Sequence, residues 1–196
     1  MFTGIVQAIG VVLRAGPGSF EVSLPVSLEG SLAVGGSIAV DGVCLTARSV
    51  QRDSFAADIS SETAARTTLG SMRVGSAANL ELAVSVNRAL DGHWVLGHVD
   101  AVGKVSGLFR EKEGWSLIVS FPPKFARYVT EKGSVAVDGV SLTPFAVTGD
   151  SFHCALIPET YEATAFHERR AGDSVNLEFD ILAKYVERMI AHVSKH

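Results

Sequence analysis

Residues 36–46 read GSIAVDGVCLT, and residues 133–143 read GSVAVDGVSLT. Nine of these eleven positions are identical, and the offset of 97 residues continues beyond them. Residues 79–81 (NLE), for example, return as residues 176–178. An offset that holds over more than forty residues without a gap indicates a tandem duplication. The chain therefore consists of two copies of one small domain, and a site can be built in each copy or between them.

The composition is that of a compact chain with room for two domains. Its 196 residues give each copy just under a hundred, which is near the size at which a domain buries its own core. With 47% hydrophobic and 19% charged residues, the chain has a globular composition. The net charge of −4 argues against nucleic acid and against an anionic membrane surface as partners, because both favour basic faces.

The cysteines and the first residues bear on where the protein works. Cys44 and Cys154 fall at positions that do not correspond in the two copies, so an ancestral disulfide within the domain is not expected. Two isolated cysteines are typical of a reduced, intracellular protein. The first ten residues lack a signal-peptide pattern, and no apolar run approaches the about 18 residues of a membrane span. We therefore expect a cytoplasmic protein with no membrane partner.

Short apolar runs separated by turn residues favour β-strands almost throughout. Examples are the runs at residues 11–13, 20–24 and 38–40, between which glycine and proline are frequent. The Asp-Gly pairs at 41–42 and 138–139 predict two-residue hairpin turns, whose central residues need positive φ. This pattern predicts an antiparallel barrel or sandwich in each copy.

Helices are expected at few places. Residues 61–69, 124–131 and 159–166 are candidates for short helices. The clearest helix is C-terminal, where apolar residues form one stripe. The members of this stripe are Ile181, Leu182, Tyr185, Val186, Met189, Ile190 and Val193. Asp180 precedes them as a candidate N-cap. The first copy has no matching helix, so the stripe packs either on the barrels or on other subunits.

The residues after each Asp-Gly pair could carry chemistry. Side chains two residues apart in a strand point the same way, so Cys44 and Thr46 share one face, as do Ser141 and Thr143. Two interpretations stay open. The polar pairs belong either to half-buried strands with internally satisfied hydroxyls, or to matching walls of two ligand pockets.

The segment 91–100, DGHWVLGHVD, holds two histidines five residues apart. A metal site is not expected, because helical zinc ligands lie four apart and an extended chain would point His93 and His98 to opposite faces. Histidine is instead well suited to general acid–base chemistry near neutral pH. Asp100, Asp180 and Lys132 are further candidates by residue type.

Several motifs together resemble the riboflavin synthase family, the enzymes that dismutate lumazine. These motifs are MFTGIV at residues 1–6, the twin strands DGVCLT and DGVSLT, GHWVLGHVD at 92–100, LIPET at 156–160 and VNLEFDILAKYVER at 175–188. The resemblance covers essentially the whole chain. It implies an all-β fold of two tandem homologous six-stranded Greek-key antiparallel β-barrels plus a C-terminal α-helix. We expect an N-terminal lumazine-binding barrel at 1–88, a C-terminal one at 89–180 and an oligomerisation helix at 181–196.

The same resemblance implies a function. Members of the family convert two molecules of 6,7-dimethyl-8-ribityllumazine into riboflavin and 5-amino-6-(ribitylamino)uracil, the last step of riboflavin biosynthesis. A four-carbon unit passes between the two molecules, with no metal or external cofactor. The resemblance implies a homotrimer, in which the productive site holds two lumazines between the N-terminal barrel of one subunit and the C-terminal barrel of its neighbour. A partnership with lumazine synthase, the preceding enzyme, is left open by the sequence.

The resemblance also assigns site residues. Positions that match residues discussed as catalytic in the family are Phe2, Ser37, Cys44, His93, His98, Ser141 and Asp180. Positions expected around the lumazine in the N-terminal barrel are Gly4, Ile5, Val6, Cys44, Leu45, Thr46, Asp58, Ile59, Ser60, Ser61, Glu62 and Thr63. Those expected in the C-terminal barrel are Ser141, Leu142, Thr143, Ile157, Pro158, Glu159, Thr160, Tyr161 and Glu162. Further contacts across the interface are expected from Gly97, His98, Val99 and Lys132. We expect His98 to transfer a proton and Cys44 to make the two pockets unequal.

Two other classes of protein compete with this interpretation. A non-catalytic lumazine- or flavin-binding protein, such as an optical antenna, would keep the barrels and lose site residues, whereas Cys44, both central histidines and Ser141 are present. A nucleic-acid-binding barrel would show basic faces with stacking aromatics, and the chain has 17 basic against 21 acidic residues.

Asp91 and Ala101 stand where glycine is common in the family. Pro144 must end its strand or lie on an edge.

Overall fold

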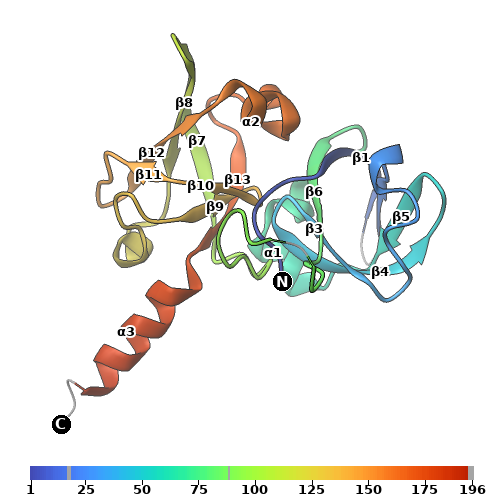
Figure 1. The fold of residues 1–196 in the computed structure, drawn as a ribbon, viewed down its shortest axis with the longest axis horizontal. Helices are drawn as coiled ribbons and strands as arrows, with labels where there is room; N and C mark the ends of the chain where they lie inside the picture. The colour runs from blue at the N-terminus through green and yellow to red at the C-terminus, as the bar shows by residue number, and fades with distance from the viewer. Residues whose placement is uncertain (17–18, 88, 194–196) are drawn as a thin grey trace.

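The computed structural model describes residues 1–16, 19–87 and 89–193 and places them in two β-rich halves (Figure 1). The first half is a closed barrel. Its strands are β1 (Ala8–Gly16), β2 (Ser19–Ser23), β3 (Ser37–Val40), β4 (Val43–Val50), β5 (Ser54–Ala57) and β6 (Ala77–Leu82). Around the barrel they follow the order β1-β2-β5-β4-β3-β6 with antiparallel neighbours. The chain thus passes from β2 to a non-adjacent strand, β3, as a Greek key does.

The second half repeats this order with one strand interrupted. Its strands are β7 (Ala101–Glu111), β8 (Gly114–Ser120), β9 (Val135–Val137), β10 (Val140–Leu142), β11 (Pro144–Phe145), β12 (Ser151–Leu156) and β13 (Ser174–Phe179). The order among the described residues is β10-β9-β13-β7-β8-β12-β11. The two edge strands β10 and β11 are separated only by Thr143, so the sheet must curl until its edges meet.

The predicted all-β fold with a duplicated barrel is confirmed, and the second copy departs from the expected six strands. Strands β10 and β11 together occupy the place of β4 in the first barrel. Pro144 has no N–H for a sheet ladder and lies in edge strand β11, opposite Cys154. The proline therefore splits one strand into two, as its position in the sequence indicated.

Two offsets relate the copies. Ala8 of β1 lies opposite Leu80 of β6, and Ala101 of β7 lies opposite Leu177 of β13. The first strands therefore match at an offset of 93 residues, while the last strands match at 97. The difference is absorbed in the β7–β8 hairpin, which is longer than its counterpart and rises from the top of the second half (Figure 1).

The short helices lie where the sequence predicted them, except for the one at residues 26–28, which was not predicted. The α-helices are α1 (Ser61–Arg66) and α2 (Pro158–Ala163), and the 3-10 helices are η1 (Val26–Leu28), η2 (Thr68–Ser71), η3 (Pro123–Tyr128) and η4 (Ala165–Glu168). Each barrel encloses its own apolar core. The predicted domain ranges stay a prediction, because the boundary falls on Arg88, which lies outside the described residues.

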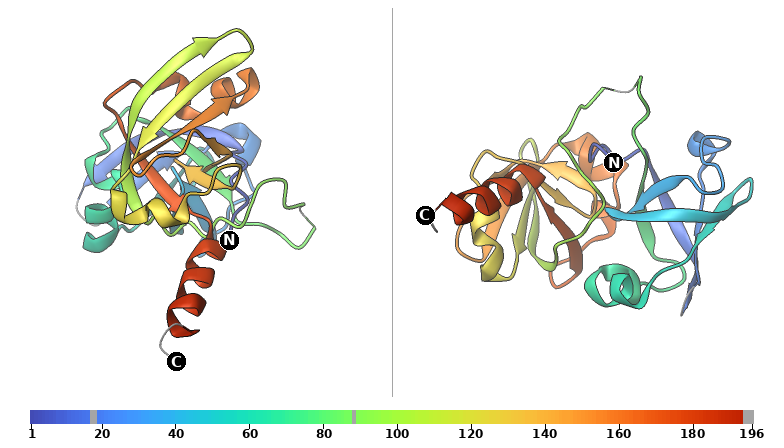
Figure 2. Two further views of the ribbon diagram at one scale, coloured as in Figure 1. Left: turned by 90° about the vertical axis from the view of Figure 1, so that its left-hand side faces the viewer. Right: turned by 90° about the horizontal axis from the view of Figure 1, so that it is seen from below.

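The two barrels meet at a seam that the N-terminus enters (Figure 2). Fully buried Phe2 pairs with Val95 through two backbone hydrogen bonds of 2.7 and 3.2 Å. These two side chains form a small apolar cluster with Ala39 and Ala136, which occupy matching positions in β3 and β9. The turn glycines Gly42 and Gly139 also lie against each other, so the copies are related by an approximate two-fold axis at this point.

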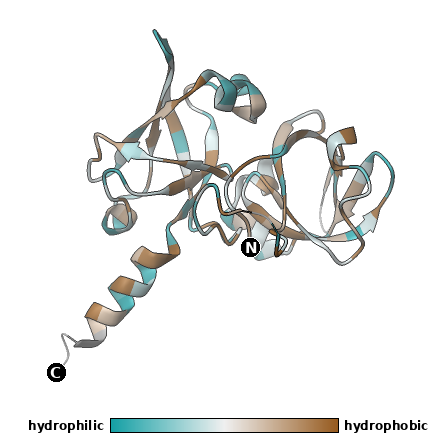
Figure 3. Ribbon diagram, viewed as in Figure 1, coloured by the Kyte–Doolittle hydropathy of each residue, from teal (hydrophilic) through white to brown (hydrophobic). Residues whose placement is uncertain are grey.

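The C-terminal helix α3 (Ile181–Val193) projects away from the barrels (Figure 1). The predicted N-cap is confirmed, because Asp180 Oδ1 accepts the Leu182 N–H at 2.9 Å. Apolar and polar residues alternate in bands along the helix (Figure 3). Apolar side chains from Leu182 to Ile190 in the stripe are 53–68% exposed. Residues 194–196 lie outside the described part, and no described helix is long and apolar enough to span a membrane.

Candidate active site

One face of β4 and the start of α1 form a pocket in the first barrel. The cavity measures about 430 Å³ and is lined by Cys44, Leu45, Thr46, Arg48, Asp58, Ser60 and Thr63. Cys44 and Thr46 alternate with buried residues along β4 and share its less buried face, as predicted. At the rim, Arg48 and Asp58 form an ion pair of 3.4 Å.

A segment of the second copy lies against strand β4 beside this pocket. The Cys44 N–H donates to the Gly97 carbonyl at 2.9 Å, and Gly97 lies so close that an added Cβ would sit 2.5 Å from the Cys44 Cβ. Val99 packs against the core of the first barrel. His98 lies between these two residues in the chain, so the fold brings its backbone close to the strand that lines the first pocket.

The same arrangement occurs in the opposite direction, where a segment of the first copy lies against the second barrel. The Ser141 N–H donates to the Gly4 carbonyl at 2.8 Å, and an added Cβ on Gly4 would sit 2.6 Å from the Ser141 Cβ. Val6 packs against the second core. We expected Gly4 to Val6 around the lumazine of the first barrel, and this placement is corrected. The N-terminal segment crosses the seam, where Phe2 pairs with Val95 of the second copy.

Ser141 has a further partner that Cys44 lacks. His93 Nδ1 lies 2.7 Å from Ser141 Oγ. The histidine is buried, with 7% of its surface exposed, and its Nε2 has no hydrogen-bond partner among the described residues. Burial lowers the His93 pKa, and the nearby Asp180 carboxylate opposes this shift. A neutral imidazole therefore orients the serine hydroxyl, and the two copies differ by more than a thiol and a hydroxyl.

The remaining predicted site residues spread over several places. Ser37 begins β3 opposite Thr46, Phe2 lies on the seam, and Leu142 is buried in β10. Thr143 joins β10 to β11, and Lys132 lies in a nearby turn with φ of 64°. Exposed Glu62 pairs with Arg66 at 3.1 Å. Ile59 and Ser61 line a separate apolar cavity of about 590 Å³ beyond α1.

Residues 157–162, which were predicted to contact the second lumazine, form the N-cap and most of helix α2. Ile157 is its N-cap residue, and Pro158 is its first helical residue. Tyr161 stacks on Trp115 with ring centroids 3.8 Å apart, and Pro158 and Glu162 line a cavity of about 300 Å³ beside them. Glu159 and Thr160 lie on the same turn, where Thr160 accepts from Thr164 Oγ1 at 2.7 Å. Thr63 accepts from Thr67 in the same way in the first copy.

The residues of the second barrel that match the first pocket are less polar. Three polar residues of the first pocket have apolar counterparts at the offset of 97 residues. The pairs are Arg48 and Phe145, Asp58 and Ala155, and Ser60 and Ile157. The rim of the first pocket therefore offers charged and hydroxyl groups where the second barrel carries apolar side chains.

Sequence reasoning missed a buried charge cluster on the seam. The turn residues Asp41 and Asp138 are fully buried, and Arg169 reaches both, at 2.8 and 2.9 Å. Burial raises the pKa of Asp41 to about 8, Asp138 adds to the rise, and Arg169 opposes it. Burial also raises the pKa of Asp138. The repeated Asp-Gly pairs could have drawn attention to the two carboxylates. Arg169 is not repeated, because Met72 stands at the matching position of the first copy, so nothing in the sequence pointed to it.

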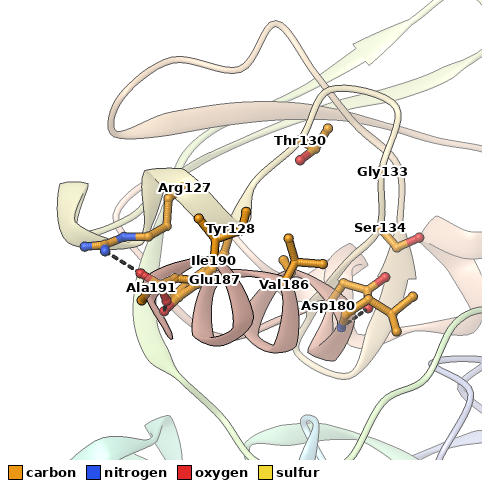
Figure 4. A pocket seen from close by; sticks show the side chains of 12 residues that line it. Arg127, Tyr128, Thr130, Gly133, Ser134, Asp180, Val186, Glu187, Ile190 and Ala191 are labelled. Atoms are coloured by element: carbon orange, nitrogen blue, oxygen red, sulfur yellow. Dashed lines mark hydrogen bonds and ion pairs between the residues drawn. The ribbon is translucent and has the colours of Figure 1, made fainter. Parts of the chain in front are cut away.

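Another cavity, of about 610 Å³, lies between α3 and the loop at residues 127–134 (Figure 4). Arg127 and Tyr128 both donate to Glu187 of α3. Of the predicted catalytic residues, this cavity contains Asp180. The predicted chemistry of Cys44, His98 and Ser141 therefore lies elsewhere, around the seam.

Comparisons with known proteins agree with this architecture. The family described as the lumazine binding domain matches residues 3–83 and 96–180, once for each barrel. The chain is 42% identical over 200 residues to a riboflavin synthase of Mycobacterium bovis, covering 97% of this chain and 98% of the relative. It is 40% identical to that of Photobacterium phosphoreum, covering 97% and 89% of the two chains.

The chain belongs to the riboflavin synthase family. A third member, from Bacillus subtilis, is 34% identical over 193 residues and covers 97% of this chain and 90% of the relative. Solved structures of LumP have the same fold. The complex of LumP with riboflavin has a TM-score of 0.84 at 22% identity and covers 91% of this chain and 99% of LumP. In this riboflavin synthase family member, each of the two matched regions lies within one of the two barrels.

Proposed function

We propose that this chain converts two molecules of 6,7-dimethyl-8-ribityllumazine into riboflavin and 5-amino-6-(ribitylamino)uracil. The observation that carries the proposal is the pair of matched strand positions Cys44 and Ser141, each hydrogen-bonded to a glycine of the other copy, in a chain of the riboflavin synthase family. A reaction between two identical molecules requires two similar binding places. The polar differences between the pockets allow one molecule to give and the other to receive the four-carbon unit.

Alignment of the two substrates supplies the larger part of the rate. Holding two reactants in reacting geometry can contribute about 7–11 kcal/mol. A single acid–base group contributes about 10²–10⁴-fold, which is about 3–5 kcal/mol. Point changes around the pockets should therefore give graded losses, except where a side chain also positions a ring.

Specific groups would carry the proton chemistry. The reaction removes a proton from the C7 methyl group of one lumazine, and His98 at the first pocket is our proposed acceptor. It also adds a nucleophile, such as water, to the other lumazine. The thiol of Cys44 and the His93-bound hydroxyl of Ser141 make the two places chemically distinct. Of the other residues proposed as catalytic, Phe2 belongs to the apolar cluster that contacts Cys44, Ser37 pairs with Thr46 across β3 and β4, and Asp180 lies near His93.

The first experiment is incubation of purified protein with 6,7-dimethyl-8-ribityllumazine alone, followed by absorbance and fluorescence. We expect catalytic formation of one riboflavin per two lumazines consumed. His98→Ala should lower kcat by about 10²–10⁴-fold. Cys44→Ser, which copies the residue of the second pocket, should cause a smaller loss. A protein that binds lumazine with a stable spectrum and yields no riboflavin would be a ligand carrier, and our catalytic assignments would be wrong.

We also propose that the chain assembles as a cytoplasmic homotrimer, with each productive site between barrels of neighbouring subunits. The exposed stripe of α3 supports this assembly, because apolar side chains on a projecting helix gain stability when another copy covers them. Sedimentation equilibrium should give three times the chain mass, and Val186→Glu should reduce it to the mass of one chain. A Val186→Glu variant that remains trimeric would contradict a role for this stripe.

A further inference from the structure

Two segments cross the seam between the barrels, one at residues 2–6 and one at residues 95–99. We call them the entering segments, and a buried glutamate binds the backbone of each. Glu178 in β13 accepts the backbone N–H groups of Leu96, Gly97 and His98 at 2.6, 2.8 and 2.9 Å. Its residue surface is 3% exposed. Three charge-assisted hydrogen bonds to one carboxylate fix the backbone of these residues more strongly than neutral acceptors would.

The first copy repeats this device. Glu81 in β6 is also 3% exposed and accepts from the Thr3 N–H and hydroxyl at 2.8 Å and from the Gly4 N–H at 3.0 Å. Each carboxylate belongs to the barrel whose entering segment it holds, and that segment then hydrogen-bonds to Cys44 or Ser141 of the other barrel. The two glutamates occupy matching positions at the offset of 97 residues.

The segments differ in the side chain that they deliver. At the offset of 93 residues, Gly97 matches Gly4 and His98 matches Ile5. One framework therefore carries an imidazole in the segment beside β4 and an aliphatic side chain in the segment beside β10. The backbone contact of Glu178 with His98 itself, together with the contact of Gly97 with Cys44, connects this carboxylate directly to the predicted proton-transfer group.

We propose that Glu178 is a positioning residue for His98, and that its carboxylate fixes the imidazole over the pocket of the first barrel. This inference rests on the proposed function. Lys184 of α3 faces Glu178 and pairs in turn with Asp100. Glu178 of the sheet therefore holds the segment, and Lys184 of the helix supplies a positive charge near this carboxylate.

The test is a double-mutant cycle with Glu178→Gln and His98→Ala. A glutamine replaces one of the two carboxylate oxygens by an NH₂ group that cannot accept from an N–H donor, and it removes the negative charge, so the segment should be held less firmly. We expect Glu178→Gln to lower kcat by about 10-fold or more, within the range that one proton-transfer group contributes, while KM changes little. In the His98→Ala chain the same substitution should cost almost nothing further, because both changes remove one function.

Glu81→Gln is the matched control. It releases a segment without a titratable side chain, so its effect on kcat should be the same in the native and His98→Ala backgrounds. Equal losses from Glu178→Gln in both backgrounds would overturn the proposal. Glu178→Asp, which keeps the charge and withdraws it by one methylene, provides a milder variant for the same cycle if the glutamine chain does not fold.

A second readout does not depend on turnover. Amide hydrogen exchange of Gly97 and His98 should be slow in the native chain and in Glu81→Gln, and faster in Glu178→Gln. Unchanged protection in Glu178→Gln would overturn the proposal. A native chain that forms no riboflavin would refute the proposed function instead, and the exchange measurement would still decide whether Glu178 holds the segment.

Discussion

Replacing Arg169 by methionine is expected to lower the free energy of unfolding by about 3–5 kcal/mol at pH 7. Methionine is the residue at the matching position of the first copy, Met72, so the substitution fits the fold locally. The loss arises because the buried carboxyl groups of Asp41 and Asp138 would lose the guanidinium that bonds to both of them. Urea unfolding followed by circular dichroism measures the change.

The loss in free energy of unfolding caused by Arg169→Met should depend on pH. Both carboxyl pKa values are raised in the folded chain, so the folded state binds more protons than the unfolded state above about pH 4. The stability that these carboxyls contribute is present below the unfolded pKa and is lost as pH rises through the folded pKa, which is about 8 for Asp41. Removal of Arg169 raises both pKa values further, so its cost should be smaller at pH 5 than at pH 8.

Arg170→Met is the control for this prediction. Arg170 is exposed and adjacent in the chain, and its substitution should change the free energy of unfolding by less than about 0.5 kcal/mol. If Arg169→Met unfolded at the same urea concentration as Arg170→Met, another group would have to compensate the two buried carboxylates.

Replacing Gly97 by alanine is expected to reduce kcat/KM for riboflavin formation by about 10²-fold or more, because a displacement of about 1 Å at reacting groups can cost that much. Gly97 has φ of 80°, and an added Cβ would approach the Cys44 Cβ to 2.5 Å and its N to 2.8 Å. The backbone atoms of β4 cannot move aside without distorting the barrel. The methyl group would instead lift the segment that carries His98 from the first pocket. Steady-state kinetics and lumazine binding by fluorescence measure the effect.

Gly35→Ala provides a control with the same backbone cost. Gly35 has φ of 81°, and an added Cβ there meets no heavy atom within 4 Å. Both substitutions force a left-handed conformation, at about 1–2 kcal/mol, and only Gly97→Ala adds the collision with Cys44. The Gly35 variant should therefore remain active. Equal activities of the two variants would show that the contact between Gly97 and Cys44 does not position the site.

Local signals in the sequence predicted much of this fold. Asp41 and Asp138 have φ of 43° and 46°, as two-residue Asp-Gly turns require. Strand alternation correctly placed Cys44 and Thr46 on one face of β4. Asp180 caps α3 as expected. Such features depend on a few neighbouring residues and on the chirality of the backbone, so a short stretch of sequence is enough to specify them.

The sequence by itself thus determined the duplication, the strand pattern and the residue types that face each pocket. Only the tertiary structure decided which segment lies against which barrel, that Arg169 joins the two Asp-Gly turns and that His93 bonds to Ser141. These contacts join residues 31 to 137 positions apart. They arise where the two barrels bury a shared seam, and burial turns an exposed turn carboxylate into a group that needs a charged partner. No local pattern encodes that need, because it exists only once the two copies have packed together.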